Sequence, residues 1–95
     1  MALTKTVEIG QVEVVGEFKA VQVRTDTVII ENGKELSRSY HRHVLHPGAL
    51  DDSDNLVATD ISGEDSSVQG ICNAVWTQAI KDDWKAKLIA DKTAL

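Results

Sequence analysis

The sequence predicts a single α+β domain, 1–95, in which an antiparallel β-sheet of about three strands is followed by one long C-terminal amphipathic helix. Three observations favour this class. Residues 4–46 are rich in β-branched side chains and alternate apolar with polar positions, as strands of a half-buried sheet do. An Asn-Gly pair, Asn32-Gly33, separates two such runs. From about residue 63, apolar side chains instead recur three and four residues apart, which is the period of an amphipathic helix.

The first strand-like run, residues 4–15 (TKTVEIGQVEVV), changes phase at its middle. Val7 and Ile9 occupy odd positions, whereas Val12 and Val14 after Gly10 occupy even positions. One extra residue in a strand shifts the alternation in this way, so the pattern predicts a β-bulge or bend at Gly10-Gln11.

The next two runs form a predicted hairpin around Asn32-Gly33, because a two-residue type I′ turn needs positive φ at both central residues. A regular hairpin fixes the register, with Glu31 facing Lys34, Ile29 facing Leu36, Thr25 facing Tyr40 and Val21 facing Val44. One face then collects the predicted core residues, which are Val21, Val23, Thr25, Thr27, Ile29, Leu36, Tyr40 and Val44. The other face is predicted to be wet or an interface, with Gln22, Arg24, Asp26, Ser37, Ser39, His41 and His43.

Residues 47–62 (PGALDDSDNLVATDIS) read as an acidic loop, and the helix is predicted over about 63–90 with Ser62 as its N-cap. One helical stripe comprises Val68, Ile71, Cys72, Val75, Trp76 and Ala79. Beyond it, Ile80, Trp84 and Leu88 step by four residues and therefore advance about 40° at each step. We predict that Trp84 packs against another polypeptide or against the folded-back loop, and Ile80, Trp84 and Leu88 are interface candidates.

Composition excludes several classes of function. Ten Lys and Arg oppose fifteen Asp and Glu, for a net charge of −5, and the basic residues are scattered instead of clustered. Nucleic-acid binding, which depends on clustered cations, is therefore not expected. No apolar run has the length of a signal-peptide core or a membrane span, so no membrane association is expected. The single cysteine, Cys72, fits a reducing cytoplasm.

His41 and His43 are the strongest metal-ligand candidates, because residues i and i+2 of a strand share a face. A closed zinc site needs four ligands, and only one cysteine exists, on a distant helix. In the predicted register, His41 faces Arg24 and His43 faces Gln22, with Asp26 diagonal to His41, which supplies hydrogen-bond partners without a metal. We expect no metal here and retain both histidines as interface candidates.

The remaining constellations do not support catalysis or cofactor binding. The run Asp51–Asn55 resembles a calcium loop, but Leu56 replaces the required glycine and Ser62 the final glutamate. Cys72 lies within the apolar helical stripe, so burial is expected instead of nucleophilic chemistry. Because no nucleotide-binding or hydrolase motif is present, the sequence predicts no cofactor and no enzymatic activity.

Three segments together, residues 20–30, SRSYHRHVL (37–45) and SGEDSSVQGICNAVWT (62–77), resemble small proteins encoded by tailed phages of marine and cyanobacterial hosts. The resemblance implies a structural virion component with a decoration, neck, connector or fibre-attachment role. It implies as partners other phage structural proteins and copies of the chain itself. It also implies a location in the host cytoplasm during assembly and then in the virion.

Two alternatives remain open. The spacing of His41 and His43 is similar to the His-x-His motif with which trimeric phage spikes bind iron on a threefold axis, although those motifs lie in long intertwined β-shafts. A small acidic domain also suits a phage-encoded modulator that binds a host protein.

Overall fold

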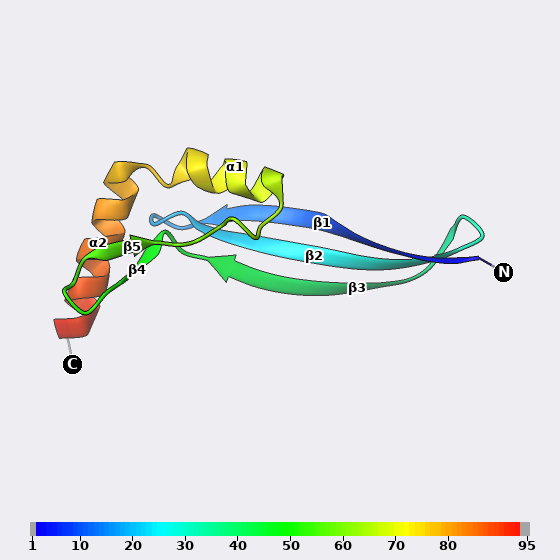
Figure 1. Ribbon diagram of the computed structural model, residues 1–95, viewed down its shortest axis with the longest axis horizontal. Helices are drawn as coiled ribbons and strands as arrows, with labels where there is room; N and C mark the ends of the chain where they lie inside the picture. Colours follow the sequence, from blue (N-terminus) through cyan, green and yellow to red (C-terminus); the bar gives the residue numbers. More distant parts are fainter. Residues whose placement is uncertain (1, 94–95) are drawn as a thin grey trace.

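The computed structural model describes residues 2–93 and consists of a long three-stranded antiparallel sheet joined at one end to two helices (Figure 1). The sheet has the order β1-β2-β3, with β1 over Leu3–Val15, β2 over Ala20–Glu31 and β3 over Lys34–Leu45. A small second sheet pairs β4 (Gly48–Leu50) with β5 (Leu56–Ala58), and α1 (Ser66–Val75) and α2 (Gln78–Thr93) follow. The predicted α+β class is confirmed.

The molecule is elongated. Its principal extents are 59 × 28 × 22 Å, and its radius of gyration is 17.6 Å, against about 12.4 Å for a compact domain of this length. Figure 1 shows both helices at one end, with the sheet projecting away from them towards the β2–β3 turn. We call this projecting part of the sheet, residues 3–8, 27–31 and 34–39, the arm.

The β2–β3 turn and the β1 bulge are both where the sequence predicts them. Asn32 and Gly33 have φ values of 52° and 81°, as a type I′ turn requires. The β1–β2 register shifts between Ile9 and Gln11, so Gly10 is the extra residue of a bulge.

The predicted β2–β3 register is wrong beyond the turn. Glu31 faces Lys34 as expected, but a second bulge leaves Leu36 without a partner, and Thr25 faces His41 instead of Tyr40. Because the side-chain period of a strand is two, one inserted residue moves every later side chain to the opposite face.

The faces of β3 are therefore exchanged relative to the prediction. His41 and His43 lie opposite Thr25 and Val23, on the face that contains the core. Conversely, Tyr40 faces Asp26 on the other side of the sheet. The predicted core positions Leu36, Tyr40 and Val44 are exposed for this reason.

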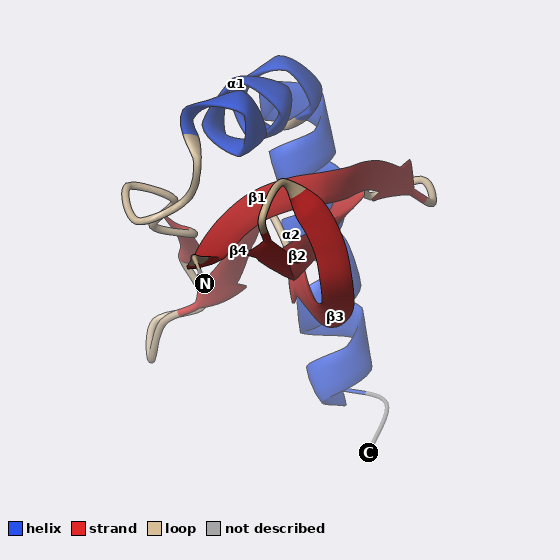
Figure 2. Ribbon diagram, turned by 90° about the vertical axis from the view of Figure 1, so that its right-hand side faces the viewer, coloured by secondary structure: helices blue, strands red, loops and turns tan. Residues whose placement is uncertain are grey.

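The core lies between α1 and one face of the sheet, and Figure 2 shows α1 lying over the sheet. It joins two valines of β2 to three residues of the α1 segment, and the buried set is Val21, Val23, Val68, Cys72 and Trp76. The indole Nε1 of Trp76 donates a hydrogen bond to the backbone oxygen of Lys19 at 2.8 Å. The predicted burial of Cys72 is confirmed, and burial raises the pKa of its thiol.

The one long helix predicted for the C-terminal part is instead two helices. Helix α1 begins after Asp65, whose carboxylate accepts a hydrogen bond from the Ser67 backbone at 3.0 Å, so the predicted cap Ser62 is wrong. Trp76 ends α1 with ψ of 68°, outside the helical region. This break turns α2 away from the large sheet and places it against β4 (Figure 1).

Residues 47–62, expected to be a loop, contain the β4–β5 hairpin. The Asp51 carboxylate accepts hydrogen bonds from the backbones of Ser53 and Asn55, both at 2.9 Å, so the acidic run acts as a turn. Within residues 2–93, neither helix has the length and apolar character needed to cross a membrane.

Candidate interaction surfaces

Trp84 lies in a second, smaller cluster at the junction of α2 and β4. Its ring stacks on His46 with centroids 5.1 Å apart and an interplanar angle of 6°. The Phe18 ring lies 5.4 Å away on the β1–β2 turn. The indole Nε1 donates to the backbone oxygen of Gly48 at 2.8 Å. Of the predicted 47–62 loop, only Gly48 meets Trp84 in these contacts, through the indole hydrogen bond, whereas the two ring contacts come from Phe18 and His46, which lie outside that loop.

The other two helix candidates lie beside this junction. Ile80 packs against the main core, and Leu88 is half-buried on α2. Ile80, Trp84 and Leu88 therefore do not form one continuous uncovered flank, because α2 turns away from α1 and meets β4.

The two histidines have different surroundings. His43 Nε2 lies 2.7 Å from Glu64 Oε1, which ties β3 to the segment before α1. His41 is exposed, with its ring centroid 6.3 Å from that of His43. The prediction that His41 faces Arg24 and His43 faces Gln22 is wrong, because the bulge at Leu36 shifts the register. Nowhere in the described chain do three His, Cys, Asp or Glu side chains gather closely enough to hold a metal ion.

The opposite face of the sheet carries an ion-pair network centred on Asp26, which is 1% exposed. Arg24 Nε lies 2.9 Å from Asp26 Oδ1, and Arg38 Nη1 lies 2.9 Å from Asp26 Oδ2. Arg38 also contacts Glu8 at 3.1 Å and Glu35 at 2.8 Å. One guanidinium therefore links all three strands at the base of the arm.

Electrostatics within this network favour the charged forms. Burial by itself raises the pKa of Asp26, but the hydrogen bonds from Arg24 and Arg38 outweigh it and leave the pKa below its ordinary value. The hydrogen bond from Arg38 likewise lowers the pKa of Glu35. The network was not predicted. The signal in the sequence is the pair Arg24 and Asp26, which lie two residues apart in β2 and therefore share a face.

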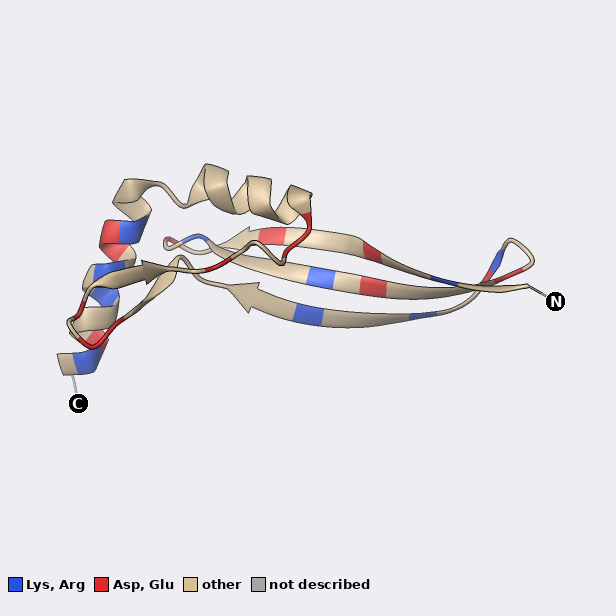
Figure 3. Ribbon diagram, in the orientation of Figure 1, with Lys and Arg blue, Asp and Glu red and all other residues tan. Residues whose placement is uncertain are grey.

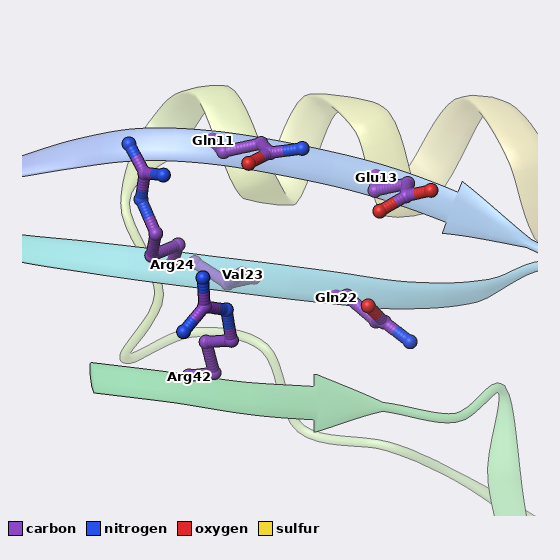
Figure 4. A pocket seen from close by; sticks show the side chains of 6 residues that line it. All are labelled: Gln11, Glu13, Gln22, Val23, Arg24 and Arg42. Carbon is purple, nitrogen blue, oxygen red and sulfur yellow. The ribbon is translucent and has the colours of Figure 1, made fainter. Parts of the chain in front are cut away.

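A shallow hollow of about 30 Å³ lies beside the network. Figure 4 shows its polar side chains on the face of the sheet away from α1, and the lining residues are Gln11, Glu13, Gln22, Val23, Arg24 and Arg42. Arg24 lies directly opposite Arg42 in the register, and its guanidinium is 4.7 Å from the centre of the Tyr40 ring. The hollow has room for a few waters at most, and Glu13 is the acidic side chain in its lining.

Charge elsewhere is dispersed. Figure 3 shows acidic and basic residues interspersed along the strands, with lysines gathered on α2 and acidic residues in the β4–β5 turn. Lys92 Nζ lies 2.6 Å from Asp54 Oδ1 and ties these two regions together.

The arm carries several exposed apolar side chains. Leu3 is 61% exposed, Val7 62% and Leu36 55%, because α1 covers only the other end of the sheet (Figure 1). Strands β1 and β3 are both edge strands of the described sheet. An edge strand presents unpaired backbone donors and acceptors, so the arm is a candidate surface for binding another polypeptide.

Comparison of the chain with protein-family models, with curated proteins and with solved structures gives no match in any of the three.

Proposed function

We propose that this chain is a non-enzymatic structural or adaptor protein of a tailed-phage particle, and that it acts through protein–protein contacts made by its arm. The single observation that supports this role best is the exposed arm of an elongated molecule, with Leu3 and Val7 uncovered on one face. The phage setting rests on the resemblance of the three sequence segments. The proposed partners are other phage structural proteins and copies of the chain itself, without nucleic acid or membrane.

The surface area supports a role in contact formation. The solvent-accessible surface is 6314 Å², whereas a compact protein of 10.4 kDa exposes about 5,400 Å². The excess of about 900 Å² is similar to the roughly 800 Å² that one partner buries in a standard interface. An arm of this size therefore provides enough surface for one specific contact.

The ion-pair network supports a shape-based role. Asp26 and Arg38 hold the three strands together at the base of the arm. A ribbon held in this way resists bending at this point, because bending it would separate the buried Asp26 carboxylate from Arg38. A firm projecting arm suits a protein that positions its neighbours.

The test is incorporation into particles. Wild-type chain, Val7→Asp and the matched control Val57→Asp are supplied during infection, and purified particles are quantified by mass spectrometry. Val57 is a suitable control because it is 55% exposed on β5, at the other end of the molecule. We expect several copies per particle for the wild type and the control, and few or none for Val7→Asp.

Absence of the wild-type chain from particles would overturn the proposal. Recovery of a single host protein at unit stoichiometry by affinity capture from infected cells would instead support the modulator alternative. Equal incorporation of Val7→Asp would remove the arm from the contact.

A further inference from the structure

We infer that the arm binds the arm of a second copy of this chain, through antiparallel pairing of the outer edge of β1 with itself about a twofold axis at Thr6. This inference rests on the proposed function, because it names one partner of the arm. It would extend the three-stranded sheet to a six-stranded sheet.

The free edge of β1 has a definite hydrogen-bonding pattern. Asn32 N–H donates to the backbone oxygen of Ala2 at 3.2 Å. Ala2 and Asn32 follow directly on the opposed pair Leu3 and Glu31, so they mark a hydrogen-bonded position of the ladder. Since hydrogen-bonded and non-hydrogen-bonded pairs alternate in an antiparallel ladder, the even residues of β1 bond inward to β2 as far as the bulge. The odd residues before the bulge, Leu3, Lys5, Val7 and Ile9, therefore direct their backbone groups outward.

Symmetry restricts the register. A twofold axis perpendicular to the sheet pairs residues of equal parity, so that both side chains point to the same face. An axis at Lys5 would place this residue opposite its own copy, which is unfavourable for like charges. An axis at Val7 would place Leu3 opposite Gln11, beyond the bulge, where the ladder is interrupted.

An axis at Thr6 avoids both problems. It pairs Leu3 with Ile9 of the second copy and Lys5 with Val7 of the second copy, and these outward-directed residues form the hydrogen-bonded pairs. Leu3, Val7 and Ile9 then lie beside the same residues of the copy, which reduces the exposure of the two most exposed apolar side chains of the arm, Leu3 and Val7.

The helices are compatible with this arrangement. The core under α1 involves β1 through Ile9 and Val12. Of these, only Ile9 belongs to the paired residues 3–9, and it takes part in the pairing through its outward backbone groups. Because the strands run in opposite directions, the two copies of α1 lie at opposite ends of the joined sheet and leave the centre open. The interface therefore needs no movement of the core.

The other edge is less suited to self-pairing. The bulge at Leu36 interrupts β3 within the arm. Arg38 and Arg42 lie on the same face of β3, and antiparallel self-pairing about Tyr40 would place them opposite each other. A regular stretch from Leu3 to Ile9 makes β1 the better edge.

The first test is the mass of the purified full-length chain by light scattering at about 100 μM. We expect twice 10.4 kDa for the wild type and a monomer for Val7→Pro, because proline removes an outward N–H without breaking a bond to β2. The matched control Tyr40→Pro, on the outer edge of β3, stays dimeric. Thermal melts show whether each variant is folded.

A second measurement does not depend on a proline variant folding. Opposite residues at the Thr6 axis form a non-hydrogen-bonded pair with Cα atoms about 4.5 Å apart, within disulfide range. Thr6→Cys should form a covalent dimer under mild oxidation, whereas Ser39→Cys on β3 should not. Buried Cys72 does not interfere.

A monomeric wild type, a mass that grows beyond the dimer with concentration, or cross-linking through Ser39→Cys instead of Thr6→Cys would each overturn the β1 pairing. Failure of this inference is distinct from failure of the proposed function. A monomer in solution that is present in particles overturns only the pairing, and a dimer that is absent from particles overturns only the virion role.

Discussion

The Asp26 carboxylate occupies the space above Gly10 that any β-carbon at position 10 would fill. Gly10 is also the extra residue of the β1 bulge. The absence of a side chain at the bulge therefore makes room for the buried acid at the centre of the ion-pair network.

Gly10→Ala should destabilise the protein by about 1–3 kcal/mol, because the new methyl group displaces Asp26 from its arginine partners. The free energy of unfolding in urea measures the effect. Gly63→Ala is the matched control, since no atom lies within 4 Å of a β-carbon there and the backbone φ lies outside the left-handed region. Equal stability of the two variants would show that the close approach of Asp26 to Gly10 does not constrain the fold.

Acid should destabilise the fold partly through Asp26. A carboxylate whose pKa is lower in the folded than in the unfolded chain stabilises the fold above its ordinary pKa, about 3.9 for Asp, and this contribution is lost as pH falls through the folded value. Asp26 and Glu35 both have lowered pKa values. We expect the free energy of unfolding to decrease as pH falls below about 4.

The Asp26→Asn variant isolates that contribution. It should be less stable at pH 7, because two arginines lose their anionic partner, and its stability should change less with pH between about 5 and 3. Asp83→Asn, at an exposed position on α2, should keep the wild-type pH dependence. Parallel curves for Asp26→Asn and the wild type would contradict the assignment.

Trp84→Ala should lower the stability of the isolated chain by about 2–4 kcal/mol, because Trp84 joins α2 to His46 and Gly48. Trp84→Phe retains the ring contact and loses only the indole hydrogen bond, so it should lose about 1 kcal/mol. Chemical denaturation followed by fluorescence of Trp76 measures both variants. An unchanged midpoint for Trp84→Ala would mean that this side chain is not part of the chain's own packing.

The two histidines should respond differently to substitution. His43→Ala removes the contact with Glu64 and should lower the free energy of unfolding by about 0.5–1.5 kcal/mol. His41→Ala, at an exposed position, should change it by less than about 0.5 kcal/mol. Thermal unfolding of the two variants at equal concentration is the measurement. A larger loss for His41→Ala would indicate an intermolecular contact.

Several features were predictable because they depend on local properties. The Asn32-Gly33 turn follows from the positive φ that both residues tolerate, and the change of phase at Gly10 reveals the bulge. The helical spacing of Val68, Cys72 and Trp76 indicates the face that packs on the sheet. Each of these signals lies within a few residues of the feature it predicts.

The bulge at Leu36 illustrates what local signals miss. Leu36, Tyr40 and Val44 alternate with polar residues, so the pattern favours the regular register that places them on the core face, and it gives no sign of the bulge. The structure selects the register that brings Arg38 to the face of Asp26, where its guanidinium neutralises the buried acid, and His43 to within 2.7 Å of Glu64.

By itself, then, the sequence determined the class, the hairpin turn, the β1 bulge and the helical face that packs on the sheet, because backbone preference and hydrophobic period set them. Only the tertiary structure decided the face of the histidines, the division of the helix at Trp76 and the intramolecular cover of Trp84. These outcomes depend on partners far apart in the chain, such as Asp26 with Arg38 and Trp84 with His46. Their energies arise only when the strands and helices are already packed together.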